Sequence, residues 1–241
     1  QKATSAACLS NQKQLALAWT MYCDDNQDRI INFDLSLPSF PSSPDIPWLY
    51  YPPPVSPSVL NLNAEDAQKA KVQAGFKQGG LFQYCNNPDV MHCPGDIRAS
   101  KKVGAGYAWD SYSGVATLNG SDRRISGIFK RTALTRPSEF MLWVEENDPR
   151  GEAYQGSWIF NAAPAPSTTY SFQDSPADFH GGTSTFNFID GHAASHKWID
   201  AATISYALNM STTKYSNPPS SANSPNDTAW INKGYATKEN H

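Results

Sequence analysis

The sequence predicts an α+β fold in which an N-terminal helix packs on an antiparallel β-sheet, with long irregular loops between the other elements. Apolar residues recur with helical spacing over residues 2–24. After residue 104, short apolar or alternating runs are typical of strands. Asp190-Gly191 separates two such runs, and this dipeptide between strand-like runs is a strong hairpin signal that favours positive φ at both turn residues.

Length and composition indicate one domain over residues 1–241. The chain is 39% hydrophobic and 12% aromatic, which is enough for a core and argues against disorder. The formal net charge is −3 and no basic run occurs, so we expect no nucleic-acid partner. The longest apolar stretch, at 14–19, is far shorter than the roughly 20 residues of a membrane span. The chain begins with Gln1, so we expect that an upstream segment was removed.

Residues 2–24 are expected to form a helix with one buried face. Leu15, Trp19 and Tyr22 follow the i, i+4, i+7 spacing of a helical stripe, and Cys8 lies one heptad before Leu15. The opposite face is polar and carries Asn11, Lys13, Gln14 and Thr20. One apolar stripe needs a packing partner, and the predicted sheet supplies it.

The middle of the chain is expected to be rich in loops. Residues 34–62 contain eight prolines and read as an irregular surface segment, because proline cannot donate to a β-ladder. Residues 63–76 are predicted to form a second helix with Asn63 as its N-cap. A short helical turn is expected at 81–84.

The sheet is predicted to occupy residues 104–199. Strands are expected at 106–115, 139–145, 157–160, 183–189 and 192–198. The C-terminal tail, 200–241, is predicted to begin with a short helix at 200–208. Trp230 and Tyr235 indicate that part of this tail docks back on the domain.

The four cysteines allow several disulfide patterns. Cys8 and Cys23 lie 15 residues apart on one predicted helix, about 22 Å along its axis, which is too far for a bond. Two complete pairings remain, in which Cys8 bonds either Cys85 or Cys93, and a lone Cys85–Cys93 bridge is a third alternative. A zinc site has weak support because no C-x-x-C pair occurs.

Acidic residues after the strand at 139–145 form a candidate calcium site. The predicted ligands are Glu145, Asp148 and Asp190, with Glu146, Asp174 and Asp178 as further candidates. Paired carboxylates for acid–base catalysis are a second interpretation, and a solvated loop is the simplest one. His192 and His196 lie on a predicted strand, about 13 Å apart, so they are not expected to share a metal ion.

Three segments together resemble a known family. They are Cys8-Leu9-Ser10-Asn11-Gln12-Lys13-Gln14 and its continuation to Arg29, then Cys93-Pro94-Gly95-Asp96, and finally His180 followed after nine residues by Asp190-Gly191. In this order they resemble the bacterial prepilin-type H-X9-DG pseudopilin-like proteins. The resemblance covers residues 2 to about 200. Its motif residues here are Cys8, Asn11, Cys93, Pro94, Asp96, His180, Asp190 and Gly191.

The resemblance implies a pilin-like fold and an anchored subunit. A cleaved, methylated leader and a membrane helix would precede Gln1, and the soluble domain would be extracytoplasmic. The partners implied are other pseudopilin subunits, the secretion machinery and the inner membrane. Cysteines at the Cys8 and Cys93 positions are typical of the family, which implies a Cys8–Cys93 bridge and leaves Cys23–Cys85 as the second.

Strand geometry limits what the H-X9-DG motif can do. If residues 183–189 form a straight strand, His180 and Asp190 are separated by about 30 Å and belong to different ends of the sheet. We therefore interpret Asp190-Gly191 as a turn requirement and His180-Gly181-Gly182 as a strand-entry requirement.

Three functions follow as hypotheses. The leading one is a non-enzymatic pseudopilin-like subunit of a type II secretion or type IV pilus-like assembly, with no cofactor other than calcium. The second is a secreted glycan- or ligand-binding module with exposed aromatics, drawn from Trp48, Trp109, Trp143, Trp158, Trp198, Trp230 and the tyrosines. The third is a metal-assisted hydrolase that uses Glu145, Asp148, His180 and Asp190.

Overall fold

The computed structural model of the chain describes residues 2–35, 46–53, 55–121, 127–151, 156–163, 166–238 and 240. Its helices are α1 (Lys2–Asp25), α2 (Ala64–Gln78), α4 (Ala201–Leu208) and α5 (Pro225–Gly234), with 3-10 turns η2 (Pro88–Met91), η3 (Ile97–Ser100), η4 (Arg131–Ala133) and η5 (Thr212–Ser216). Its strands are β1 (Tyr112–Val115), β2 (Met141–Glu145), β3 (Ser157–Trp158), β4 (Phe160–Asn161), β5 (Ser171–Phe172), β6 (Thr183–Phe188) and β7 (Ala193–Lys197). The α+β class is thus confirmed.

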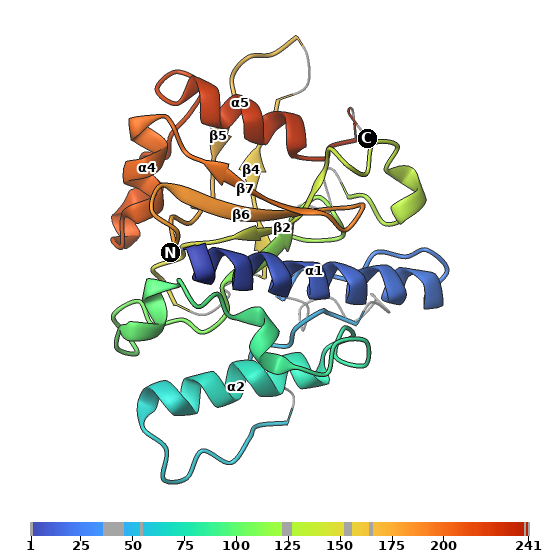
Figure 1. The fold of residues 1–241 in the computed structure, drawn as a ribbon, viewed down its shortest axis with the longest axis vertical. Coiled ribbons are helices and arrows are strands. Elements are labelled where there is room, and N and C mark those ends of the chain that lie inside the picture. The colour runs from blue at the N-terminus through green and yellow to red at the C-terminus, as the bar shows by residue number, and fades with distance from the viewer. Residues whose placement is uncertain are drawn as a thin grey trace.

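Helix α1 packs along the sheet, as the sequence predicts. Figure 1 shows it on one side of β6 and β7, with α4 and α5 on the other side. Its buried face includes the predicted stripe of Leu15, Trp19 and Tyr22 together with Cys8. The gain from burying these apolar side chains explains why a helix with no acidic residue in its first turn is stable here.

The main sheet is mixed, whereas the sequence predicted an antiparallel one. Its strand order among the described residues is β3-β1-β2-β6-β7. All neighbouring pairs are antiparallel except β1 and β3, which pair in parallel with Gly114 opposite Ser157. After β2 the chain passes to the far side of β1 instead of returning beside β2 in a hairpin. Strand β3 runs antiparallel to β2, and its new position beside β1 makes that pair parallel.

The β6–β7 hairpin is present, but its turn differs from the one predicted. The amide of Gly191 donates to the Phe188 carbonyl at 2.8 Å, and the amide of Phe188 donates to the His192 carbonyl at 3.0 Å. Gly191 has φ +88°, while Asp190 is absent from the described residues with positive φ. Only the glycine therefore needs the left-handed region, as in a turn that ends in a G1 bulge.

The helices outside the sheet are partly as predicted. Asn63 caps α2 by accepting from the Asp66 amide, and α4 begins one residue after the predicted start. Residues 81–84 form a turn, and only the last four residues of the strand predicted at 106–115 are extended. Residues 36–45 and 54 of the proline-rich segment lie outside the described part of the chain. Helix α5 was not expected in the tail, although its docking was: Trp230 packs on Phe186, and Tyr235 on Trp158.

No helix in the described ranges is both long enough and apolar enough to cross a membrane.

Candidate functional site

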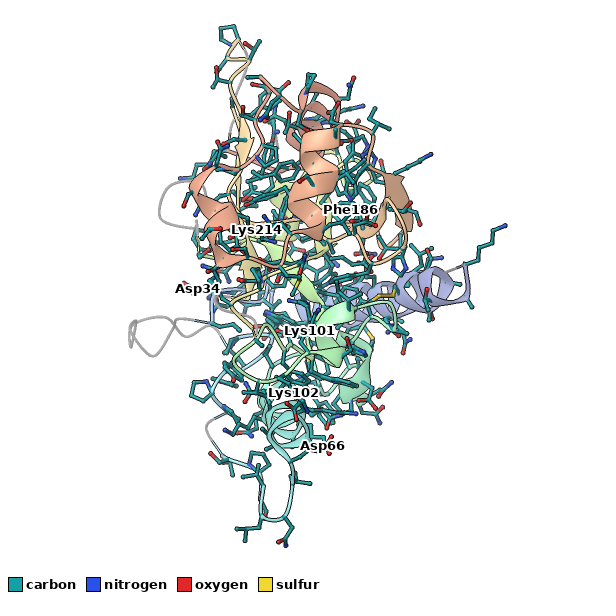
Figure 2. All side chains as sticks on the ribbon, turned by 90° about the vertical axis from the view of Figure 1, so that its left-hand side faces the viewer. Asp34, Asp66, Lys101, Lys102, Phe186 and Lys214 are labelled. Atoms are coloured by element: carbon teal, nitrogen blue, oxygen red, sulfur yellow. A yellow bond between two sulfur atoms is a disulfide. The ribbon has the colours of Figure 1, made fainter. Side chains whose placement is uncertain are left out.

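A disulfide between Cys8 and Cys93 joins α1 to the loop between η2 and η3. The two Cα atoms lie 5.2 Å apart, and 85 positions separate the residues in sequence. The bond is visible in yellow beside α1 in Figure 2. It confirms the pairing that the family resemblance implied.

The second implied bridge is wrong, because Cys23 and Cys85 are free, buried thiols. Burial raises the pKa of Cys23 to about 12 and also raises the pKa of Cys85. Both thiols are therefore protonated near neutral pH and behave as small apolar core groups.

His180 lies directly against this disulfide. Its Nε2 atom is 3.0 Å from Glu145 Oε1 and 3.5 Å from Cys93 Sγ. All four side chains of this group, which we call the Cys-His-Glu cluster (Cys8, Cys93, Glu145 and His180), are buried. Because a carboxylate oxygen only accepts, the network assigns the imidazole proton to Nε2. Nδ1 is buried and has no hydrogen-bond partner among the described residues.

The sheet fixes the position of the Glu145 carboxylate. Glu145 is the last residue of β2, and its Oε2 atom accepts from the Thr185 amide in β6 at 2.7 Å. The side-chain amide of Gln12 in α1 donates to the Thr185 carbonyl at 3.1 Å. One residue of β6 is thus bonded both to the cluster and to α1.

The residues after His180 explain the strand-entry requirement. Gly181 and Gly182 have φ values of +71° and +80°, which side chains rarely adopt. The Asp178 carboxylate accepts from the amides of Gly182 and Thr183 and closes the bend. This bend delivers His180 to the buried side of β6.

Gly95 packs against His180 and links the second motif to the third. A Cβ atom on Gly95 would lie 2.7 Å from the Phe179 carbonyl oxygen and 3.0 Å from His180 Cε1. The Gly95 amide also donates to Cys93 Sγ at 3.3 Å. The motif therefore needs glycine here because the loop backbone lies directly on the imidazole ring.

Asp96 organises the loop that carries Cys93. Its carboxylate accepts from the Arg98 guanidinium at 2.7 Å and from Ser111 Oγ at 2.7 Å. Ser111 Oγ in turn accepts from the Cys93 amide. Asn11 adds a contact from α1, because its side-chain amide donates to the His92 carbonyl at 2.9 Å. Cys8, Asn11, Cys93 and Asp96 thus belong to one arrangement, and Pro94 lies in the same loop.

Asp190 is not part of the Cys-His-Glu cluster and lies in the turn after β6, as the strand geometry predicted. Its Oδ1 atom is 2.6 Å from His192 Nδ1 and accepts from the His192 amide, so it fixes the turn after β6. His180 lies before β6 and Asp190 after it. The histidine and the Asp-Gly pair of the motif therefore have separate structural roles.

The structure does not bring together the predicted calcium ligands. Glu145 is bonded to Thr185 and His180, Asp148 to Arg150, and Asp190 to His192. Within the described ranges, the Cys-His-Glu cluster is the one group of three or more such ligands close enough to share an ion. The four residues predicted for a hydrolase are likewise separated. Glu145 and His180 are in contact, whereas Asp148 pairs with Arg150 and Asp190 with His192.

A second charged group lies close to the end of β2, and it consists of the buried Glu146, Asp148, Asp174 and Lys214 together with the exposed Arg150. Burial raises the pKa of Asp174 to about 6 and raises the pKa of Glu146 well above its ordinary value. Burial also lowers the pKa of Lys214 to about 7, and its Nζ donates to the Asn147 carbonyl at 2.7 Å. The acidic run after β2 was visible in the sequence, but the lysine from the tail was not.

The six tryptophans proposed for a glycan platform do not form one. Trp48, Trp143, Trp158 and Trp198 are buried. The other two rings, Trp109 and Trp230, are partly buried, and each is stacked on a histidine. The ring centroids of Trp109 and His92 lie 3.9 Å apart, and those of Trp230 and His196 lie 3.8 Å apart. His192 and His196 have separate carboxylate partners, Asp190 and Asp227.

Sequence reasoning missed three parts of the site. It grouped Glu145 and His180 only within the four-residue hydrolase set, did not place them beside the Cys8–Cys93 disulfide, and did not identify Thr185 or Arg98. The described part of the chain has cavities of about 210, 330 and 520 Å³, and residues outside the Cys-His-Glu cluster line them.

No family model, curated protein or solved structure matches the chain.

Proposed function

We propose that the chain is the globular domain of a non-enzymatic pseudopilin-like subunit of a type II secretion or type IV pilus-like assembly. The observation that carries the proposal is the attachment of α1, which lies along the sheet and is bonded to it near its beginning. Cys8 and Asn11 hold α1 to the η2–η3 loop, and Gln12 holds it to β6. A helix attached in this way can transmit force from an assembly to its globular domain.

The outward face of α1 supplies the contact surface for neighbouring subunits. Leu17 is 63% exposed and Met21 is 42% exposed, and they lie one helical turn apart. Neighbours of Leu17 on this face are the exposed Lys13 and Gln14. Apolar side chains inside a polar rim are typical of protein–protein contacts.

The proposal includes anchoring and location. In the family that the motifs resemble, the helix corresponding to α1 continues from a membrane-embedded segment, and the domain is extracytoplasmic. The Cys8–Cys93 disulfide is compatible with an oxidising compartment, where such bonds persist. The partners proposed are further copies of pseudopilin subunits and the secretion machinery.

A test replaces apolar contacts on α1 with charge. Leu17→Glu combined with Met21→Glu is introduced into the full-length protein, in the organism that encodes it, with tagged and untagged copies expressed together. We expect recovery of the untagged copy with the tagged one to fall at least about tenfold, which corresponds to about 1.4 kcal/mol. Unchanged recovery would contradict the proposal.

The matched control is Ile199→Glu, because Ile199 is 62% exposed and lies in the segment between β7 and α4 instead of on α1. Recovery with this variant should equal that of the wild type. Urea unfolding of the purified variants should give midpoints close to the wild-type value, since exposed positions contribute little to folding. Equal loss of recovery at both sites would indicate a nonspecific effect and would count against the proposal.

A further inference from the structure

The Cys-His-Glu cluster has the composition and spacing of a metal site. Two cysteine sulfurs, one imidazole nitrogen and one carboxylate oxygen all lie within 4.8 Å of one another. We propose that, when the Cys8–Cys93 bond is reduced, Cys8, Cys93, His180 and Glu145 bind one Zn²⁺ ion. The disulfide and the zinc site are then two alternative states of the same buried cluster, which connects α1 with the η2–η3 loop and with β2.

The distances in the cluster match a tetrahedral shell. With zinc–sulfur bonds of about 2.3 Å and zinc–nitrogen or zinc–oxygen bonds of about 2.0 Å, neighbouring ligands lie roughly 3.3 to 3.8 Å apart. His180 Nε2 is already 3.5 Å from Cys93 Sγ and 3.0 Å from Glu145 Oε1. Small movements of these side chains, together with separation of the two sulfurs after reduction, complete the geometry.

The types of ligand atom in the cluster determine which metal ion it would prefer. Thiolates and imidazole favour zinc and other borderline or soft ions, whereas calcium and magnesium take oxygen ligands. A carboxylate as the fourth ligand gives the site two thiolate charges and one carboxylate charge against one divalent cation. Because all four residues are buried, this negative charge has no access to bulk water and favours a bound cation.

Groups around the cluster would orient the ligands. The Thr185 amide holds Glu145 Oε2 at 2.7 Å, which leaves Oε1 directed at His180. The Gly95 amide donates to Cys93 Sγ at 3.3 Å, and such a contact stabilises a thiolate. Metal ligands are commonly held by outer contacts of this kind.

The chemical change balances with a dithiol reductant. The reductant gives two electrons and two protons to the Cys8–Cys93 bond through a mixed disulfide and becomes a disulfide itself. Zinc then displaces the two thiol protons, which pass to the buffer. The imidazole proton moves from Nε2 to Nδ1 as Nε2 takes the metal. Cys93 and Gly95 lie in a loop, so opening of this loop admits the reductant and the ion.

The test uses Co²⁺ as a spectroscopic probe on the purified chain. The protein is reduced, freed of reductant under anaerobic conditions and titrated with Co²⁺. We expect one ion per chain, with the intense visible bands of tetrahedral cobalt and a thiolate charge-transfer band in the near ultraviolet. Zn²⁺ should displace the cobalt, and the oxidised chain should give no such bands. Absence of tetrahedral bands in the reduced chain would overturn the proposal.

Variants identify the ligands. The double variant Cys8→Ser, Cys93→Ser should lose the charge-transfer band, and His180→Gln or Glu145→Gln should weaken binding more than about 100-fold. The control Cys23→Ala, Cys85→Ala keeps the cluster and should keep the full spectrum. Bands that follow Cys23 and Cys85 instead, or that survive His180→Gln with unchanged affinity, would refute the ligand set.

Folding is followed in the same samples by near-ultraviolet circular dichroism. If the reduced chain loses its folded signal, Co²⁺ should restore it in the wild type and in the Cys23→Ala, Cys85→Ala control. Failure of the metal to restore the signal would also overturn the proposal. Subunit assembly plays no part in this readout, so its result is independent of the function proposed above.

Discussion

At the scale of single residues, His180 explains why two separate sequence motifs belong together. The histidine begins the H-X9-DG motif, and Gly95 of the Cys-Pro-Gly-Asp segment lies against its ring. Both motifs were visible in the sequence, but their contact was not, because it depends on how the bend at 181–182 returns the chain to β2. The partner Glu145 was named as one carboxylate of an acidic run and as a member of the hydrolase set, but not as a neighbour of the disulfide.

Gly95→Ala tests this packing. The added methyl group would lie 2.7 Å from a backbone oxygen, so we expect a loss of about 1 to 3 kcal/mol in the free energy of unfolding. Urea denaturation measures it, and the imidazole NMR signals of His180 should shift. Gly104→Ala serves as the control, because its surroundings are open and only its φ of +84° opposes a side chain. A Gly95→Ala protein as stable as the wild type would contradict the packing argument.

Asp174 makes stability depend on pH. Burial raises its pKa from 3.8 to about 6, so between these pH values the folded state keeps a proton that the unfolded chain has lost. The free energy of unfolding therefore falls as pH rises through this window, by up to about 3 kcal/mol from this group. No penalty from Asp174 is expected below pH 4, where both states are protonated.

Asp174→Asn should remove that part of the pH dependence. An asparagine retains an oxygen that can accept from the Ile159 amide, as Asp174 Oδ2 does at 2.7 Å. Urea unfolding at pH 4 and pH 7 should show a smaller difference in stability than in the wild type. The matched change at an exposed carboxyl, Asp66→Asn, should leave the wild-type difference in place. Equal pH profiles for wild type and Asp174→Asn would rule out the assignment.

At the scale of elements, local patterns predicted the helices better than the sheet topology. The stripe of α1 and the cap of α2 depend on residues close in sequence, and both were confirmed. The parallel β1–β3 pair was missed because the position of a strand in the sheet depends on the path of the intervening chain. Helix α5 was missed because Pro225 and the Ser/Asn-rich residues before it read as a loop, although proline is favoured at a first helical position.

The disulfide should be the strongest single attachment of α1. It closes a loop across 85 positions, and loop entropy alone predicts a loss of about 4.6 kcal/mol without it, while 2 to 4 kcal/mol is typical of measured cases. We expect the double variant Cys8→Ser, Cys93→Ser, measured without added metal, to lose about 2 to 4 kcal/mol in urea unfolding. Cys85→Ala breaks no bond and should cost less. A smaller effect of the double variant than of Cys85→Ala would be inconsistent with this role.

At the scale of the whole molecule, one face of α1 is attached to the rest of the domain and the opposite face is exposed. Its inner face is bonded to the sheet and to the η2–η3 loop, while Leu17 and Met21 point outward. This division is what a subunit needs if it is to keep its own fold while it contacts its neighbours. The motifs allowed the function to be proposed from the sequence, and the outward side chains define where neighbours are expected to bind.

The most direct measurement of this central claim is site-specific photo-crosslinking in cells that produce the full-length protein. A photo-reactive amino acid replaces Leu17 in one strain and Ile199 in another, and both positions are similarly exposed. We predict crosslinks between copies of the chain, or to another pseudopilin subunit, from position 17 and few or none from position 199. Absence of subunit crosslinks from position 17, or equal crosslinking from both positions, would contradict the account.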